Sequence, residues 1–279
     1  MYVPALVLLL IFIVYPFLSG FKIAFTNWNG YSQDYKYVGF QNFIDMFKDV
    51  NIKTSLVNTL IYGFGSTIFQ QILGLAYAVF LNKAFRLRTF ARTVIYLPAL
   101  ISAIVMGNMW FFILKFDGGA LNDIINFFGM EPKFWLSSTT MAIILIVTIN
   151  SLQFVGVSML IYLAGLQGIP KMYYEAASLD NANSWQKFIH ITIPMLRPAV
   201  ITSVTLNLIG GLKLFDVIIA LTSGGPGYST HSLSTLLTKT YFKSQNAGYA
   251  SAMGILLFML ILIVMLIIQK TVMNKEVDY

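Results

Sequence analysis

The interval from Glu175 to Pro198, which reads EAASLDNANSWQKFIHITIPMLRP, is the one long polar and charged interval between two strongly apolar runs. Ile169-Pro170 precedes it, and proline suits the first turn of a helix. The residues that follow have the i, i+3, i+4 and i+7 spacing of one helix face. This face consists of Tyr173, Ala176, Ala177 and Asp180. The sequence therefore predicts a helix here with two small residues at the centre of one face.

The same interval contains the signals for a turn and for a second helix. Asn181 tolerates the left-handed conformation that ends a helix. A second short helix is predicted over residues 184–191, and it should stop before Pro194. We interpret the interval as a helix-turn-helix that lies at a membrane surface and is bound by another protein.

Composition places the chain in a membrane. Of its 279 residues, 57% are hydrophobic and 10% are charged, whereas soluble domains carry roughly 25% charged residues. The formal net charge is +7, but so few charges argue against nucleic acid as a partner and favour membrane lipid. The chain has no cysteine, which excludes disulfides, thiol nucleophiles and thiolate metal sites. The apolar run after Met1 lacks the basic start and the cleavage site of a secretory signal.

Six apolar stretches are long enough to cross a membrane, since a span needs about 20 mostly apolar residues. The predicted spans are Pro4–Phe25, Leu56–Leu81, Thr93–Phe116, Met141–Leu166, Ala199–Leu221 and Ala250–Gln269. The expected fold is therefore an all-α, polytopic membrane helical bundle of about six transmembrane helices. Residues 1–279 form a single transmembrane domain in this interpretation, with residues 167–198 as its loop between the fourth and fifth spans.

Charge near the span ends indicates the orientation. The short interval after the second span holds four basic residues and no acidic one: Lys83, Arg86, Arg88 and Arg92. Dense Lys and Arg near span ends mark the cytoplasmic side. An even number of spans then places both termini and the loop at 167–198 in the cytoplasm.

This loop resembles the EAA loop of permease subunits of ATP-binding cassette importers, whose pattern is roughly EAA, then DGA, then I-x-LP. The matching residues are Glu175, Ala176, Ala177, Asp180, Ala182, Ile191 and Pro194. Asn181 replaces the usual glycine and Ile193 the usual leucine, and asparagine is the next most tolerant residue for a left-handed turn. The residues that the resemblance assigns to a coupling helix, docked on a separate ATPase, are Tyr173, Glu175, Ala176, Ala177, Asp180 and Asn181.

Two other segments resemble the permeases of carbohydrate importers in particular. Residues 215–226 match the pattern F-D-x-x-x-x-x-T-x-G-G-P, and residues 38–43 are similar to V-G-F-x-N-F. The glycine run at 224–227 lacks the G-K-[ST] ending of a phosphate loop, and the motif occurs nowhere else in the chain. The chain itself is therefore expected to bind no nucleotide.

No catalytic constellation is evident, because the two histidines fall on opposite sides of the membrane and no pair of carboxylates lies within the spans. Polar amides do lie within them, at Asn150, Gln153 and Asn207. Such groups face a bundle interior or a water-filled cavity, where they either bridge helices or bind sugar hydroxyls as donors and acceptors. Phe154 is placed to stack on the apolar face of a sugar.

The resemblance implies a sugar site midway through the membrane, on the helices before and after the EAA loop. Its contact positions fall on Asn150, Gln153, Phe154, Asn207, Gly211 and Leu214. Lys213 and Asp216 lie three residues apart nearby, and we expect them to pair on one helix face. Direct contact with the sugar is the alternative.

The residues and the resemblance together predict a translocation subunit that carries a sugar, oligosaccharide or related polyol by alternating access in the bacterial cytoplasmic membrane. The implied partners are a dimer of ATP-binding cassette ATPases, which holds ATP and Mg, a second homologous permease in a heterodimer, and an extracytoplasmic solute-binding protein. The chain itself is expected to be no enzyme and to hold no cofactor or metal. Three alternatives stay open: an importer of this kind for an amino acid or phosphate, an ion-coupled secondary transporter, and a membrane enzyme or scaffold. The sequence has no clear internal repeat and no isolated carboxylate within a span, which disfavours a secondary transporter.

Overall fold

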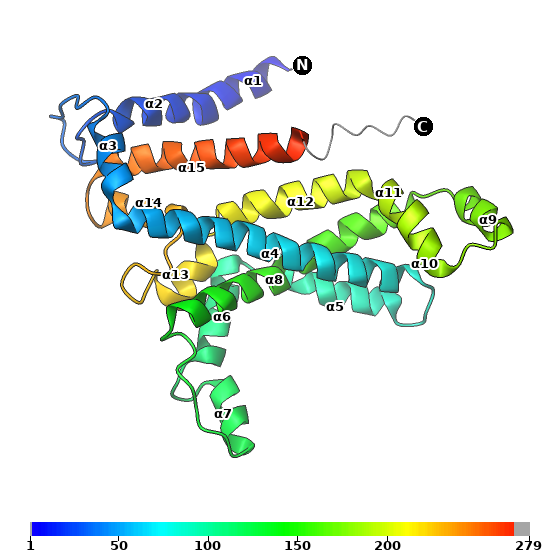
Figure 1. Cartoon of the computed structure of the whole chain (residues 1–279). Helices are drawn as coiled ribbons and strands as arrows, with labels where there is room; N and C mark the ends of the chain where they lie inside the picture. The colour runs from blue at the N-terminus through cyan, green and yellow to red at the C-terminus, as the bar shows by residue number, and fades with distance from the viewer. Residues whose placement is uncertain (1, 271–279) are drawn as a thin grey trace.

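The computed structural model describes residues 2–270, which form helices joined by short loops and one isolated bridge between Thr26 and Tyr37 (Figure 1). The all-α membrane bundle predicted from the sequence is confirmed. In chain order the helices are α1 (Val3–Leu9), the π-helical η1 (Leu10–Val14), α2 (Tyr15–Ala24), α3 (Gln41–Lys48), α4 (Val50–Asn82), α5 (Arg88–Leu100), α6 (Ala103–Leu114), α7 (Ala120–Phe127), α8 (Thr139–Gln167), α9 (Lys171–Leu179), α10 (Ser184–Lys187), the π-helical η2 (Phe188–Thr192), α11 (Ile193–Met195), α12 (Arg197–Leu212), α13 (Asp216–Thr222), α14 (Leu233–Phe242) and α15 (Ala247–Ile268).

Four helical stretches among residues 2–270 are long and apolar enough to span a membrane, and two bent pairs raise the total to six if each pair is one span. The four are Val3–Ala24, Val50–Asn82, Thr139–Gln167 and Ala247–Ile268. The two pairs are Arg88–Leu100 with Ala103–Leu114, and Ser184–Met195 with Arg197–Leu212. The number of predicted spans agrees with this upper count, but the predicted third and fifth spans are not single straight helices.

The predicted third span, residues 93–116, bends by 98° between α5 and α6. Pro98 lies inside α5, and the chain becomes extended three residues after it, at Ile101 and Ser102. A proline removes one helical hydrogen bond and leaves carbonyl groups to be satisfied by neighbouring helices. The carbonyl of Ile101 accepts a hydrogen bond from Gln153 Nε2 on α8 at 3.1 Å, which compensates for the break.

The predicted fifth span, residues 199–221, is also interrupted. Helix α12 ends at Leu212 and α13 begins at Asp216, so residues 213–215 separate two helices. Two successive glycines, which are poor helix formers, come just before the break. The carbonyl of Leu214 accepts a hydrogen bond from Ser232 Oγ at 2.8 Å, so the break is stabilised from outside the helix.

The second short helix of the loop continues further than predicted. It does not stop before Pro194, because the turn at Phe188–Thr192 is π-helical and α11 follows it directly. Pro194 lies in the first turn of α11, where its missing N–H group has little cost. The chain then bends by 63° into α12.

Helices α4, α8 and α12 pack against one another at the centre of the molecule, with α5 against α8 and α13 against α6. Helices α2, α14 and α15 form a neighbouring group, and α7 projects away from the bundle (Figure 1). The helical stretch Val3–Ala24 buries none of its most apolar window within the chain. Its apolar surface is therefore available to lipid or to another membrane protein.

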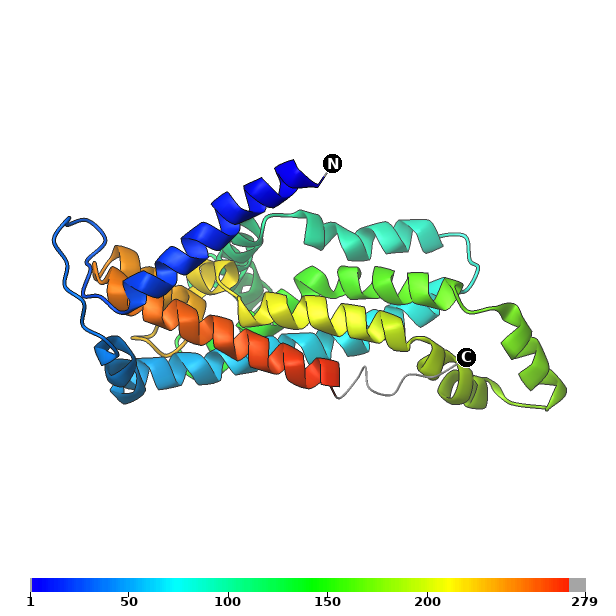
Figure 2. The same cartoon turned by 90° about the horizontal axis from the view of Figure 1, so that it is seen from above.

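The bundle has two distinct ends, which we call the α9 end and the α3 end after the helices that lie there (Figures 1 and 2). The start of α1, the end of α15 and the loop between α4 and α5 all lie toward the α9 end in both views. The turn between α13 and α14 lies toward the α3 end. The basic interval at 83–92 and the loop at 167–198 therefore share one end of the molecule, as the predicted topology requires.

Candidate functional site

A cavity of about 320 Å³ lies between α4, α8, α12 and the break that follows α12. Its volume is at the lower end of the range for small-molecule sites. Its lining residues are Gln70, Ala103, Asn150, Phe154, Val157, Leu206, Asn207, Gly210, Gly211, Lys213, Leu214, Phe215 and Asp216. Asn150 lies about 17 Å from the start of α8 and about 26 Å from its end, at 1.5 Å per residue. The cavity is therefore in the middle part of the bundle.

Five of the six predicted contact residues line this one cavity: Asn150, Phe154, Asn207, Gly211 and Leu214. They come from α8, α12 and the break after α12, about 50 residues apart in the sequence. The packing of α8 against α12 brings them together.

The two amides in the cavity have hydrogen-bonding capacity to spare. Asn150 is only 3% exposed, yet its side chain has no hydrogen-bond partner within residues 2–270. Asn207, 8% exposed, donates from Nδ2 to Ser158 Oγ at 2.6 Å and to Ser203 Oγ at 3.4 Å. Those bonds fix the amide plane and leave Oδ1 of Asn207 as an acceptor.

Gln153, the sixth predicted contact residue, does not line the cavity. Its Nε2 donates to the carbonyl of Ile101 in the break between α5 and α6, and its Oε1 has no partner within residues 2–270. Asn150 and Gln153 are three residues apart on α8, but Gln153 contacts the break between α5 and α6. The structure thus places Gln153 where it holds a bent helix.

The two successive glycines of α12 have different surroundings. A Cβ atom on Gly211 would lie 2.9 Å from Gly63 Cα and 3.1 Å from the carbonyl oxygen of Tyr62, so Gly211 lets α12 approach the backbone of α4. A Cβ atom on Gly210 would have no heavy atom within 4 Å. Gly210 is therefore the position that leaves open space in the cavity, while Gly211 serves the contact between helices.

Sequence reasoning missed Gln70 of α4. It is 1% exposed and lines the cavity, its Nε2 donates to the backbone carbonyl of Asn150 at 3.2 Å, and its Oε1 has no partner within residues 2–270. The available signal was an amide in the middle of the second span, but the contact positions that the resemblance implies lie only on the fourth and fifth spans. Two of the charged residues noted in the sequence, Lys213 and Asp216, also line the cavity.

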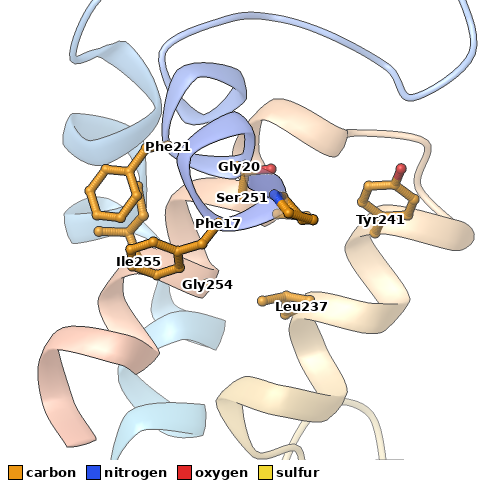
Figure 3. Close-up of a pocket in the computed structure, with 10 residues that line it drawn as sticks. Phe17, Gly20, Phe21, Leu237, Tyr241, Ser251, Gly254 and Ile255 are labelled. Atoms are coloured by element: carbon orange, nitrogen blue, oxygen red, sulfur yellow. The ribbon is translucent and has the colours of Figure 1, made fainter. Parts of the chain in front are cut away.

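A second cavity, of about 260 Å³, lies between α2, α14 and α15 (Figure 3). Phe17 and Phe21 of α2 lie on one side of it, and Leu237 and Tyr241 of α14 on the other. Its only side-chain hydroxyls belong to Ser251 and Tyr241, and it has no amide or charged side chain. An apolar lining of this kind suits a hydrocarbon surface far better than a polyhydroxylated solute.

The loop at the α9 end has the turn that the sequence predicts. Asn181 has φ 56°, in the left-handed region. The N–H groups of Asn181 and Ala182 donate to the carbonyls of Ser178 and Ala177 at 3.1 and 2.9 Å, which is the Schellman ending of a helix. Asn183 then caps α10 in a capping box with Gln186. The turn therefore survives the replacement of the usual glycine.

Helix α9 carries an exposed surface. None of its nine residues is buried, and Met172 and Leu179 are 65% and 86% exposed. Five of the six predicted coupling residues are exposed: Tyr173, Glu175, Ala176, Asp180 and Asn181. The sixth, Ala177, is half-buried. Helix α9 therefore presents apolar side chains outside the bundle.

Two side-chain contacts hold α9 against the helices that follow it. Tyr174 OH and Thr192 Oγ1 are 2.9 Å apart, and Lys187 Nζ donates to Ser178 Oγ at 2.7 Å. Tyr174 also packs on a buried cluster that includes Tyr162 and Leu196. Helix α9 is thereby joined to η2, which leads through α11 into α12, whose far end lines the cavity.

The glycine-proline turn at the α3 end is pinned to α4. Asn58 Nδ2 donates to the carbonyls of Ser229 and His231 at 2.7 and 3.0 Å, and Tyr62 OH donates to that of Thr230 at 2.9 Å. His231 is buried against Gly224, which has φ +86° and no room for a Cβ atom. Burial, with smaller contributions from Lys239 and Lys243, lowers the pKa of His231 to about 4. The neutral ring is thus a packing element of the turn.

Comparison with known proteins identifies the family of this chain. The family model described as "Binding-protein-dependent transport system inner membrane component" matches residues 70–275. The chain belongs to this family. The family members are permease components of transport systems located in the inner membrane, and the several apolar helices of this chain make it a multi-pass member.

Two relatives illustrate the similarity. The trehalose/maltose transport system permease protein MalF of Thermococcus litoralis is 32% identical over 94% of this chain and 88% of its own length. The probable starch degradation products transport system permease protein AmyD of Thermoanaerobacterium thermosulfurigenes is 30% identical over 99% of this chain and 93% of its own. Among solved structures, a bacterial ABC transporter involved in the import of the acidic polysaccharide alginate has a similar fold, with a TM-score of 0.86 and 23% identity over 98% of this chain and 93% of that chain.

Proposed function

We propose that this chain is a transmembrane subunit of an ATP-driven, binding-protein-dependent importer that carries a sugar, oligosaccharide or related polyol. The observation that carries the proposal is the meeting of five predicted contact residues around one cavity in the middle of the bundle. The names of the two relatives above, which concern trehalose, maltose and starch degradation products, support a carbohydrate.

The cavity offers what a sugar needs. The amides of Asn150 and Asn207 provide donors and acceptors for hydroxyl groups, while Phe154 and Leu214 present apolar surface to the C–H faces of the rings. Gln153 supports the site indirectly in this proposal, because it holds the break between α5 and α6. Gly210 leaves space for the solute, and Gly211 keeps α12 close to α4.

Energy for transport comes from partner subunits. Helix α9 inserts into a groove of an ATP-binding cassette ATPase, a helix-in-groove contact, with the six coupling residues at or beside the interface. A dimer of ATPases binds ATP and Mg and closes on them. The docked α9 moves with its ATPase, and the links from Tyr174 and Lys187 pass this motion to η2 and α12. The cavity then opens alternately to the two sides of the membrane.

The assembly includes two further partners. A second homologous permease completes the translocation path, because the most apolar window of the stretch Val3–Ala24 is unburied within this chain. A solute-binding protein delivers sugar at the α3 end. The α9 end, with its basic interval Lys83–Arg92, faces the cytoplasm together with both termini. The same machine for a non-sugar solute is the second candidate, and the names of the two relatives disfavour it.

Reconstitution in liposomes tests the proposal. The complete transporter, with its ATPase and binding protein, should concentrate a radiolabelled saccharide from a panel of neutral, acidic and amino sugars when ATP is present on the α9 side. The permease without the ATPase should move no solute against a gradient. Concentrative uptake driven by a proton gradient without ATP, or transport of no saccharide of any kind, would overturn the proposal.

A further inference from the structure

The break between α12 and α13 places two opposite charges in the cavity lining. Lys213 and Asp216 are both exposed to this space, and no ion pair joins them within the described residues 2–270. The expected pairing on one helix face was wrong, since α12 ends at Leu212 and α13 begins at Asp216. The two residues are three apart in the sequence but lie on different helices or between them, so the i, i+3 geometry is lost.

From this arrangement we propose that the cavity selects an uncharged polyhydroxylated solute, with Lys213 and Asp216 as the residues that exclude charged ones. This inference rests on the proposed function, that is, on the cavity being the place where the solute is held. Lys213 and Asp216 are the only ionisable side chains among the thirteen lining residues, so the lining has one positive and one negative charge. The two charges act on a solute in opposite ways.

A solute with a single charge meets one attractive and one repulsive group in a small space. A carboxylate on a sugar is attracted by Lys213 but repelled by Asp216. An ammonium group is attracted by Asp216 but repelled by Lys213. Like charges brought together at a binding surface reduce affinity strongly. A hydroxyl group avoids the conflict, because it donates to the carboxylate of Asp216 and accepts from the ammonium of Lys213. An uncharged sugar therefore satisfies both residues at once.

A zwitterion would also match one positive and one negative group, and the amides argue against it. Gln70 Oε1 is a buried acceptor without a partner within residues 2–270, and the side chain of Asn150 lines the same cavity. A buried acceptor that lacks a donor is costly. A solute with several hydroxyl groups supplies donors to Gln70 and Asn150 as well as to Asp216. A small zwitterion engages the two charges and has no hydroxyl group left for the amides.

The test uses the complete transporter in proteoliposomes with ATP and with its binding protein. Uptake is measured for the neutral saccharide that it carries best and for two analogues of that saccharide, one with a primary alcohol oxidised to a carboxylate and one with a hydroxyl replaced by an amino group. Glycine betaine serves as the zwitterionic probe. Binding of each probe to the binding protein is measured separately, so that uptake can be corrected for the selectivity of the binding protein.

We expect the wild-type transporter to prefer the neutral saccharide over either charged analogue by about tenfold or more. Asp216→Asn should raise the relative uptake of the carboxylate analogue, and Lys213→Gln that of the amino analogue, each by several-fold. Lys53→Gln and Asp117→Asn, which change exposed charges outside the lining, are the matched controls and should alter neither ratio.

Three outcomes would overturn the inference: equal uptake of neutral and charged analogues by the wild type, identical effects of both variants on all probes, or preference for glycine betaine. The first two leave the proposed function intact, because a saccharide is still carried in an ATP-dependent manner. Failure to carry any saccharide would instead refute the proposed function. The effects of the two variants are read as ratios between probes, so a lower amount of folded transporter does not imitate them.

Discussion

The cavity in the bundle and helix α9 at its end are both rich in polar groups, but the two regions are constructed in opposite ways. In the cavity the side chains of Gln70, Asn150 and Asn207 are at most 8% exposed and still have hydrogen-bonding capacity that residues 2–270 do not use. On α9 no residue is buried, while the carbonyls of Ala176, Ala177 and Ser178 at the end of the helix accept hydrogen bonds from the turn that contains Asn181.

The difference indicates what each region meets. Buried polar groups without partners are costly and are kept where a ligand or water completes them, which fits a small polyhydroxylated molecule. An exposed helix with apolar side chains such as Leu179 fits the surface of a protein. If this distinction is right, changes in the cavity should alter dependence on solute concentration, and changes on α9 should alter coupling.

The largest effect is expected from Glu175→Lys on α9. The reversed charge at the centre of the proposed ATPase contact should lower ATP-driven uptake by a factor of about 30 or more, which is the loss of one interface hot spot of about 2 kcal/mol. Copurification of the ATPase should fall with it, while the amount of permease in the membrane should not change. Glu131→Lys, an exposed acidic residue far from α9 in the sequence, is the matched control. Unchanged uptake and copurification would refute the docking role of α9.

Much of the arrangement that this prediction uses was evident from the sequence. Long apolar stretches identify membrane helices because every residue of a span lies in lipid or in the protein interior. The four unbroken spans agree with α1–α2, α4, α8 and α15 to within about six residues. The left-handed Asn181 was predicted because few residue types tolerate that conformation. Both signals are local, and local signals are the ones that a single sequence carries well.

The bend at residues 101–102 follows from a local signal, Pro98, whereas the break at 213–215 was not predicted. The hydrogen-bond partners that stabilise both breaks lie elsewhere in the chain. Gln153 on α8 and Ser232 before α14 supply the hydrogen bonds that the broken helices need. A sequence does not show which distant side chain will satisfy a freed carbonyl. For the same reason Gln153 was grouped with Asn150, and Lys213 was expected to pair with Asp216. Whether an amide in a span faces a cavity or a broken helix depends on packing between helices.

The adjacent glycines of α12 provide the next test, because Gly210 is proposed to leave space for the solute and Gly211 to let α12 pack against α4. Gly211→Ala would push a methyl group to within 2.9 Å of Gly63 Cα, so we expect destabilisation by about 1–3 kcal/mol from overpacking. Gly210→Ala adds a methyl group in open space and should keep or slightly raise stability, since alanine favours helix over glycine by up to about 1 kcal/mol. Its effect should be a higher half-saturating solute concentration. Thermal unfolding and uptake kinetics of the two variants separate the roles, and equal behaviour of both would contradict them.

Asn150→Ala should give a smaller and more selective change. Loss of one or two hydrogen bonds to the solute, about 1–1.5 kcal/mol, raises the half-saturating concentration by about tenfold while the assembly with the ATPase stays intact. Asn108→Ala is the matched control, because Asn108 is exposed on α6 and outside the cavity lining. Wild-type kinetics for the Asn150 variant would remove this residue from the site.

The smallest effect is expected at Asn181, and it bears on what the turn of the coupling loop requires. Because Asn181 has φ 56°, Asn181→Gly should leave uptake unchanged and raise the thermal stability slightly, within about 1 kcal/mol, since glycine adopts this conformation without a steric penalty. Asn181→Val should lower both, because a β-branched side chain is strained there. Position 181 would then contribute through its backbone alone. If Asn181→Gly instead reduced uptake while the turn stayed intact, the asparagine side chain would have to contact the ATPase directly. The end of α9 would then contribute a side chain to binding, as the cavity does, and the contrast between the two regions would fail.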